Sequence, residues 1–416
     1  MIKKIIISAC LLLSFVSFAQ QGTASPYSFF GIGDVRYKGT TESRSMAGVQ
    51  VEQDSIHINL DNPSSFASLK LTTFSIAGTY NGTKLKTDSQ TASTKRTTLD
   101  YLAFAVPFGK FGAGFGLIPY SSVGYSIESL ATDSSQNNNR FEGNGGLSKA
   151  FFGAGYKIIP GLNIGADVQY SFGKINSSSL AFITGVPVGT QETNKVFLSG
   201  VNFDLGMMYQ AKINTKLSVY SSLNYTIESS LKSENTRNVY AVRYNASYNL
   251  SIVDALEPVV LKTDLTLPSK LTFGAGIGET RKWLVGAQIS LRDKGSLSNE
   301  FNSMDNVTYV KNQKYSVGGY YIPKYNSFFG YSKRITYRGG FKYEKTSLIV
   351  NSEPINDIGI TLGLGMPITG SFSNLNFGFE LGKKGTTSSG LVQENYATFS
   401  VGLSLNDKWF VKNKYN

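Results

Sequence analysis

The chain of 416 residues is only 16% charged, carries a formal net charge of +12 and is rich in glycine (43), tyrosine (24) and phenylalanine (27). No shift in composition divides it into the two or three soluble domains that its length would allow, which favours one large domain. One cysteine and one histidine exclude Cys/His catalysis and Cys/His metal sites, and basic residues scattered along the chain argue against nucleic acid as a partner.

Residues 1–19 have the three parts of a secretory signal peptide. Two lysines precede a long apolar run, and Ala19 completes a small-x-small cleavage site. We therefore predict that the mature chain begins at Gln20 and is exported. A lipoprotein cleavage box ending at Cys10 is the alternative. Cleavage there would leave an apolar core of about four residues, against the roughly 7–15 of a signal peptide.

Residues 20–68 do not alternate in the manner of strands, and we predict that they form a hatch inside the domain that follows. Small residues lie near the middle of this segment, and an Asn-Pro step near its end interrupts any regular strand. His57, the lone histidine, lies here and is expected to be a structural hydrogen-bonding group. The hatch residues singled out by these features are Ser45, Met46, Ala47, Gly48, Asn62, Pro63, Ser64 and Phe66.

Residues 69–416 are predicted to form the wall of a transmembrane barrel. In 162–173, every second residue from Leu162 to Phe172 is apolar, and the residues between them are polar or glycine. Such alternation sends successive side chains to opposite faces of a strand. Segments of about ten or more residues match the roughly 9–11 that a tilted strand needs to cross a bilayer. The fold class is therefore all-β, an antiparallel up-and-down outer-membrane barrel.

About fourteen strands are expected, an even number as in bacterial outer-membrane barrels. They lie near 71–81, 98–108, 111–128, 146–158, 161–173, 195–212, 216–229, 268–278, 282–292, 314–323, 332–344, 355–367, 374–382 and 395–406. Tight turns alternate with long polar connections at 82–97, 129–144, 174–193, 230–267, 294–313, 345–354 and 383–394. The connection 230–267 is long enough for a further hairpin, which would change the count. Pro119 predicts a bend in the third strand.

The apolar face of each strand must meet lipid, so the polar face lines the interior. The charged side chains expected in the lumen are Asp167, Asp204, Glu228, Arg292, Arg338, Lys342, Glu344, Asp357 and Glu380. Gly112, Gly114 and Gly116 resemble a phosphate loop, but no helix follows them. They are expected to leave room for the hatch. No catalytic, cofactor-binding or metal-binding residue is predicted, and interior carboxylates near basic residues are expected to be ion pairs.

The Ser45–Gly48 step, the Asn62-Pro63-Ser64-Ser65 step before the first strand and the end Leu405–Phe410 resemble the FadL-like outer-membrane proteins. This resemblance implies a barrel with an N-terminal hatch. The family includes long-chain fatty-acid and hydrocarbon transporters as well as relatives that act as partners in protein secretion. The chain departs from the transporters at Asp61, where they commonly have an aromatic residue, and it shows no apolar ligand-cleft motif.

Two functions, both non-enzymatic and without a cofactor, follow for a protein of the bacterial outer membrane. The favoured hypothesis is a scaffold or interaction subunit of outer-membrane protein assembly or secretion machinery, because no apolar pocket is evident. The alternative is a channel for hydrophobic small molecules that is gated by the hatch. The basic balance predicts outer-membrane lipid or glycolipid as one partner. Outer-membrane or periplasmic proteins are the other expected partners, and nucleic acid is not.

Overall fold

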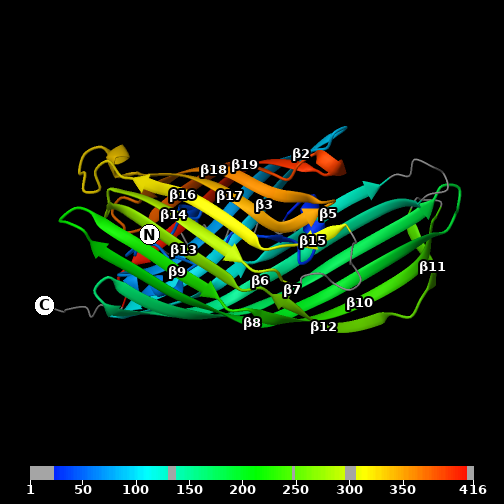
Figure 1. Ribbon diagram of the computed structural model, residues 1–416, viewed down its shortest axis with the longest axis horizontal. Coiled ribbons are helices and arrows are strands. Elements are labelled where there is room, and N and C mark those ends of the chain that lie inside the picture. The colour runs from blue at the N-terminus through cyan, green and yellow to red at the C-terminus, as the bar shows by residue number, and fades with distance from the viewer. Residues whose placement is uncertain (1–22, 130–136, 246–248, 296–305, 410–416) are drawn as a thin grey trace.

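The computed structural model describes residues 23–129, 137–245, 249–295 and 306–409, and the predicted signal peptide and the terminal Phe410 lie outside these ranges. In them the chain forms one closed antiparallel β-barrel of fourteen wall strands, closed by pairing of the first wall strand with the last (Figure 1). The predicted fold class and strand number are therefore confirmed. Within these ranges, no helix has the length and hydrophobicity of a membrane span.

Three of the fourteen wall strands are interrupted and consist of two segments each: β4 with β5, β9 with β10, and β12 with β13. The wall segments are β2 (Thr72–Lys86), β3 (Thr91–Phe108), β4 (Phe111–Pro119), β5 (Ser121–Ser129), β6 (Asn137–Ile159), β7 (Leu162–Ile183), β8 (Gly189–Lys212), β9 (Ser218–Thr226), β10 (Ser229–Tyr244), β12 (Val259–Leu267), β13 (Lys270–Glu279), β14 (Trp283–Arg292), β16 (Asn312–Tyr321), β17 (Thr336–Val350), β18 (Glu353–Pro367), β19 (Asn374–Lys384) and β20 (Gln393–Asp407). The short strands β1 (Asp34–Val35), β11 (Leu250–Ala255) and β15 (Val307–Tyr309) pair with β5, β10 and β17.

The connections divide the barrel into two ends, which we call the turn end and the loop end. At the turn end β3 passes to β4 through Gly109 and Lys110, and β6 passes to β7 through Pro160 and Gly161. The loop end holds the opposite set of connections. Several connections predicted to be long are instead short there, because β2, β3, β6, β7, β8, β10 and β12 continue through residues expected to be loop. The prediction ended these strands too early, since their apolar alternation stops where the outer face leaves the lipid while backbone pairing continues.

The bend predicted at Pro119 is present. β4 ends at this proline and β5 begins at Ser121, and both segments pair with β6. Proline has no N–H to donate to a neighbouring strand. Beyond the bend, the described residues show no pairing between β5 and β3, the strand beside it in the wall. Two residues of the hatch, Asp34 and Val35, pair with β5 instead.

The segment before β2 crosses the lumen (Figure 1). It contains the 3₁₀ helix η1 (Pro26–Phe29), β1, the single-turn helix α2 (Thr41–Arg44) and the 3₁₀ helix η2 (Pro63–Ser68). Helix α2 lies against β18, β19 and β20, whereas η2 lies against β3, β4, β6, β7 and β8. The hatch therefore contacts two sectors of the wall, one on each side of β2.

Glycines on the inner face let the hatch backbone approach the wall closely. A Cβ atom added at Gly112 would lie 1.9 Å from the carbonyl oxygen of Phe66, and one at Gly206 would lie 2.0 Å from the side-chain oxygen of Asn62. At Gly363 the nearest atom would be the Ser45 hydroxyl, at 2.2 Å. These distances are too short for any side chain larger than hydrogen. The predicted role of the glycine run is confirmed for Gly112 and, beside the Phe66 ring, for Gly114; Gly116 instead abuts neighbouring wall strands.

Candidate functional site

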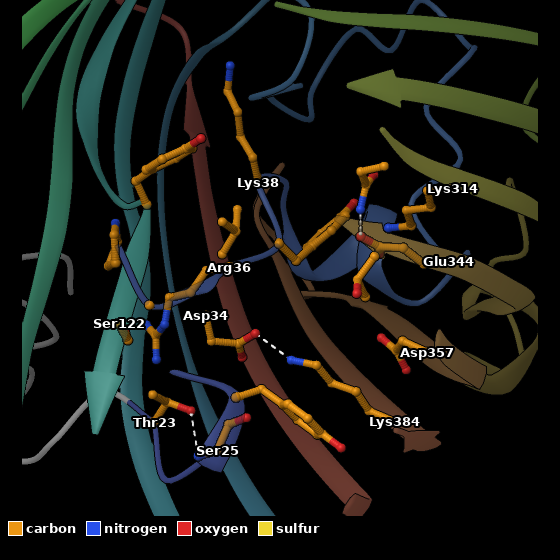
Figure 2. A pocket seen from close by; sticks show the side chains of 18 of the residues that line it. Thr23, Ser25, Asp34, Arg36, Lys38, Ser122, Lys314, Glu344, Asp357 and Lys384 are labelled. Atoms are coloured by element: carbon orange, nitrogen blue, oxygen red, sulfur yellow. Dashed lines mark hydrogen bonds and ion pairs between the residues drawn. The ribbon is translucent and has the colours of Figure 1, made fainter. Parts of the chain in front are cut away.

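The candidate site is a cavity of about 410 Å³ inside the barrel, between the N-terminal part of the hatch and the wall. Figure 2 shows that charged side chains from both surround it, with Asp34 of β1 facing Lys384 of β19. The basic residues that line it are Arg36, Lys38, Arg44, Arg96, Lys149, Lys270, Arg292, Lys314, Lys342 and Lys384. The acidic ones are Asp34, Asp61, Asp100, Asp204, Glu344, Asp357, Glu380 and Glu394. The lumen is thus polar, and charges of both signs are interspersed.

One side of the cavity is a buried network centred on Gln169. Lys38 of the hatch donates to Asp204 of β8 at 2.5 Å, and the Gln169 amide donates to Asp204 at 2.6 Å and to Asp167 at 2.8 Å. Lys149 donates to the Gln169 carbonyl oxygen at 3.1 Å. The predicted lumen residues Asp167 and Asp204 therefore lie together, and both carboxylates receive hydrogen bonds.

The opposite side of the cavity is a second ion-pair cluster. Lys342 of β17 contacts Asp357 at 3.0 Å and Glu380 at 2.6 Å, and the Tyr396 hydroxyl donates to Asp357 at 2.7 Å. Residues from four adjacent strands therefore satisfy one another. Because one ammonium contacts both buried carboxylates and the Tyr396 hydroxyl bonds one of them, this cluster is an ion-pair group of the kind expected from the sequence.

The remaining predicted lumen charges have separate positions. Glu344 accepts from Asn312 at 2.7 Å, Arg338 donates to Asn376 at 3.0 Å, and Arg292 lines the cavity half-buried. The prediction that Glu228 faces the lumen is wrong, because this residue is exposed and does not line the cavity. It lies in the break between β9 and β10, where the inward-facing positions change from even to odd numbers, so the alternation does not extend to it.

Among the described residues, four charged contacts hold the hatch to the wall. Two are Lys38 with Asp204 and Asp34 with Lys384, at 2.5 and 2.6 Å. The others are Asp61 with Lys270 at 2.7 Å and Arg44 with Asp100 at 3.4 Å. Asp61, the departure from the transporter pattern, is thus a buried ion-pair partner. Lys38 and Lys149 were not predicted to lie in the lumen, although the alternation in β6 places Lys149 on the same inner face as Phe151.

The predicted hatch residues are the ones that approach the wall. Asn62 caps η2 by accepting from the Ser64 amide at 3.1 Å, and its own amide donates to Leu223 O at 3.0 Å. Ser45 O accepts from the Thr361 hydroxyl at 3.1 Å, and Ala47 O accepts from Ser316 at 2.8 Å. The remaining members are also enclosed, since Pro63, Phe66 and Gly48 are buried and Met46 packs against a buried cluster.

Arg36 of the hatch spans the interruption in the wall. Its backbone amide donates to Tyr120 O at 2.9 Å, next to Pro119, and its guanidinium donates to Leu99 O of β3 at 3.3 Å. Residues of β3 and the Pro119-Tyr120 step both line the cavity, so this interruption borders the lumen. Arg36 therefore bridges the two edges of the interruption, with its backbone amide bonded to the Pro119-Tyr120 step and its guanidinium bonded to β3.

Three titratable residues, Glu52, Asp54 and His57, lie together in the part of the hatch near the turn end. Burial raises the pKa of Glu52 to about 7, with a further contribution from the neighbouring Asp54, and Tyr320 donates to Glu52 at 2.7 Å. Burial acts against the charge of His57, but Asp54, 2.6 Å from its Nδ1, outweighs that effect and the pKa of His57 is raised. Burial also disfavours the Asp54 carboxylate, but His57 and backbone amides lower its pKa to about 2. His57 therefore has a structural partner, as predicted.

In the described ranges, no group of three or more His, Cys, Asp or Glu side chains is placed to bind a metal ion. Among the acidic residues of the cavity, Asp34, Asp204, Asp357 and Glu380 each form an ion pair with a lysine. The ion pairs between the hatch and the wall hold a polar hatch inside the barrel.

Comparison with known proteins agrees with this architecture. A family model described as BamG matches residues 1–416. A FadL homologue from Pseudomonas aeruginosa has a TM-score of 0.62 at 13% identity, covering 91% of this chain and 100% of that one. The Pseudomonas putida toluene transporter TodX has a TM-score of 0.59 at 16% identity, covering 90% and 99%. The Ralstonia pickettii toluene transporter TbuX has a TM-score of 0.58 at 16% identity, covering 89% and 98%.

A search of curated protein sequences gave no match. At identities of 13–16% the solved structures establish a shared fold, the FadL-like outer-membrane barrel. The predicted resemblance is thus confirmed.

Proposed function

This chain belongs to the BamG family, and from that membership we propose that it is a scaffold or interaction subunit of outer-membrane protein assembly or secretion machinery, without enzymatic activity. The family's name points towards assembly. The observation that carries the proposal is the fastening of the hatch. Among the described residues, four charged contacts bind the hatch to the wall, and Arg36 bridges the interruption beside β5. These contacts hold the hatch in one fixed position.

The chemistry of the cavity supports the same proposal. An apolar solute would have to pass between paired charges such as Lys38 with Asp204 and Lys342 with Glu380. Separating or desolvating such a pair costs several kcal/mol, roughly 3–5, when one partner is left buried without the other. A scaffold gains from these same contacts, because a filled lumen keeps the barrel wall and its loops in one arrangement for docking.

The proposal is tested by purifying the full-length protein from its native membrane in a mild detergent through a C-terminal affinity tag. We expect defined outer-membrane or periplasmic proteins to co-elute in fixed ratios. A FadL-like hydrocarbon transporter with the same tag is the control for non-specific capture. Elution of a lone barrel under conditions that preserve known membrane complexes would contradict the scaffold function.

A second candidate, a channel for hydrophobic small molecules, is favoured by the interruption beside β5, which borders the cavity. The solved relatives TodX and TbuX are described as toluene transporters, and this supports the same candidate. Toluene entry into liposomes that contain the protein separates the two functions. If the protein is a channel, toluene should enter the liposomes that contain the wild type and should enter faster with Arg36→Ala. If it is a scaffold, we expect neither result.

A further inference from the structure

The wall rim at the turn end is strongly basic. It comprises the ends of the strands and the residues beside or between them, namely residues 69–71, 109–110, 157–161, 212–217, 279–282, 322–335, 368–373 and 407–409. Its basic residues are Lys70, Lys110, Lys157, Lys212, Lys216, Arg281, Lys282, Lys324, Lys333, Arg334 and Lys408, and its acidic ones are Glu279 and Asp407. Of these basic rim residues, all of which the structure describes, only Lys282 has an ion-pair partner, which is Glu279 at 2.8 Å. Most of this positive charge is therefore uncompensated.

The loop end has no such imbalance. Charges of both signs occur there and form ion pairs across neighbouring strands. Examples are Arg237 with Glu192 at 2.7 Å, Arg140 with Glu142 at 2.6 Å and Lys311 with Asp293 at 2.8 Å. The basic excess of the chain is therefore concentrated at one end of the barrel, and an anionic surface would meet it there.

The loop between β16 and β17, residues 322–335, adds an aromatic tip to this rim and projects beyond the strand ends (Figure 1). Phe328 is 96% exposed and Phe329 is 89% exposed, the highest values among the described large apolar side chains. The loop itself is ordered by hydrogen bonds, since Lys324 N donates to Lys333 O at 2.8 Å and the Tyr331 hydroxyl donates to Pro367 O at 3.0 Å. An ordered loop that presents two phenylalanines to solvent is typical of a binding surface.

Aromatic and basic side chains alternate along this part of the rim. The Arg281 guanidinium lies 5.0 Å from the Tyr325 ring, and the Arg334 guanidinium lies 5.3 Å from the Tyr331 ring. Aromatic rings with lysine or arginine beside them are the combination found where proteins meet the headgroups of a bilayer.

The position of the loop fits that level of the bilayer. Tyr321 and Tyr337, exposed on the lipid-facing side, lie at the ends of the two strands that the loop joins. The hydrogen bond between Lys324 and Lys333 lies three residues beyond Tyr321, which is about 10 Å along an extended chain. Its distance from Tyr321 along the membrane normal is shorter, because the strands are tilted. A headgroup layer is about 5–8 Å thick on each side of the hydrocarbon core. The base of the loop, between Lys324 and Lys333, therefore lies at the level of the headgroups.

We propose that the turn-end rim binds anionic phospholipid headgroups of the adjacent leaflet, with Phe328 and Phe329 inserted as its anchor. This surface is separate from the lumen and goes beyond the proposed scaffold function. It would fix the tilt and depth of the barrel at the leaflet facing the turns. The periplasmic leaflet is the one concerned in the topology that an even strand number and tight turns predict.

The first test measures lipid binding to the full-length protein in detergent by native mass spectrometry, with phosphatidylglycerol and phosphatidylcholine of equal chain length. We expect phosphatidylglycerol to bind at least about tenfold more tightly, because each rim cation contributes to attraction. The variant with Lys324→Glu, Lys333→Glu and Arg334→Glu should lose at least about tenfold of that affinity. The control, Lys84→Glu, Lys86→Glu and Lys95→Glu, alters exposed lysines at the loop end and should change affinity less than about twofold.

Equal binding of the two lipids, or an unchanged affinity in the rim variant, would overturn the proposal. A rim variant that keeps its lipid affinity but loses an acidic protein that co-purifies with the wild type would make the rim a protein-docking surface, which also overturns it. Heat-modifiable migration checks that both variants are folded.

The second test uses no charge reversal, so it still tests the proposed insertion of the loop if the rim variant does not fold. Phe328→Trp and Leu256→Trp, the latter at an exposed loop-end position, are compared in nanodiscs of brominated phosphatidylglycerol after subtraction of the wild-type fluorescence. We expect quenching at position 328 and little at position 256. Equal quenching at both positions would show that the loop does not enter the bilayer.

Discussion

In the wall from β6 to β13, the half near the turn end and the half near the loop end have opposite chemistry on their two faces. In the half near the turn end, Phe203 and Leu205 face outward, while Asn202 and Asp204 are buried inside. In the half near the loop end, Leu198, with Leu231, Leu265 and Leu267, forms an apolar cluster inside, around Ile32 of the hatch. The outer face there carries Lys195, Lys232 and Lys262, all exposed.

This difference follows from the solvent that each outer face meets. Lipid requires apolar side chains outside and leaves the lumen to polar groups, whereas water outside allows the interior to be apolar as in a soluble protein. The uninterrupted strand β8 keeps even-numbered residues inside in both halves. Only the assignment of polar and apolar residues to its two faces is exchanged. Each half is therefore held together by a different force, and each can be disrupted separately.

The largest effect is expected from Lys38→Leu, which leaves Asp204 buried without its ammonium partner. We expect the free energy of unfolding in detergent to fall by about 3–5 kcal/mol, because removing one partner of a buried ion pair is strongly destabilising. Urea titration with heat-modifiable migration as the readout measures it. Lys232→Leu, at an exposed site in the loop-end half, is the matched control. Equal losses in the two variants would contradict the assignment of ionic contacts to the turn-end half.

The second-largest effect is expected from a charged residue introduced on the lipid-facing side of the wall. Phe203→Arg should hinder membrane insertion, since arginine near the bilayer midplane costs about 2–4 kcal/mol. Lys195→Arg, on the same face of β8 but in the loop-end half, should insert as the wild type does. The measured quantity is the heat-modifiable fraction in purified outer membranes. If both variants insert equally, the border between lipid and water on β8 has been misplaced.

The apolar cluster of the loop-end half gives a smaller effect. Leu231→Ala removes a fully buried side chain and should destabilise this half by about 2 kcal/mol, the lower end for such a change, because the site lies near water. Val201→Ala, on the lipid face, is the control and should have less effect, because lipid fills the space. Hydrogen exchange of the amides in β10 and β12 reports the difference. Unchanged exchange in Leu231→Ala would rule out a stabilising cluster.

The smallest effect concerns pH and the hatch. Glu52, with its pKa raised to about 7, and His57, with its pKa also raised, both favour the folded hatch while protonated, so their contribution is lost as pH rises through those values. Asp54, whose pKa is lowered to about 2, acts in the opposite sense and loses its contribution only as pH falls towards 2. Amides of residues 52–58 should thus exchange faster at pH 8 than at pH 5, after correction for intrinsic rates. Glu52→Gln should reduce that difference, and an equal difference in both proteins would exclude Glu52 as its source.

Alternation and glycine placement determined much of this protein from the sequence alone. The barrel class, the fourteen strands, the bend at Pro119 and the inward position of Asp167 follow from a period of two, because a strand has only two faces and lipid must meet the apolar one. The hatch could be located because residues such as Asn62 and Pro63 interrupt that period. These inferences need local information only.

The tertiary structure alone decided which groups meet. The length of the strands beyond the membrane was hidden, because polar segments pair through their backbones and leave no apolar alternation to detect. Glu228 was misplaced because the break between β9 and β10 shifts the pattern by one residue. The pairing of Lys38 with Asp204, and of Arg36 with Leu99, depends on how a non-repeating segment crosses the lumen. Contacts between such distant residues are fixed by barrel closure, which no local pattern in the sequence contains.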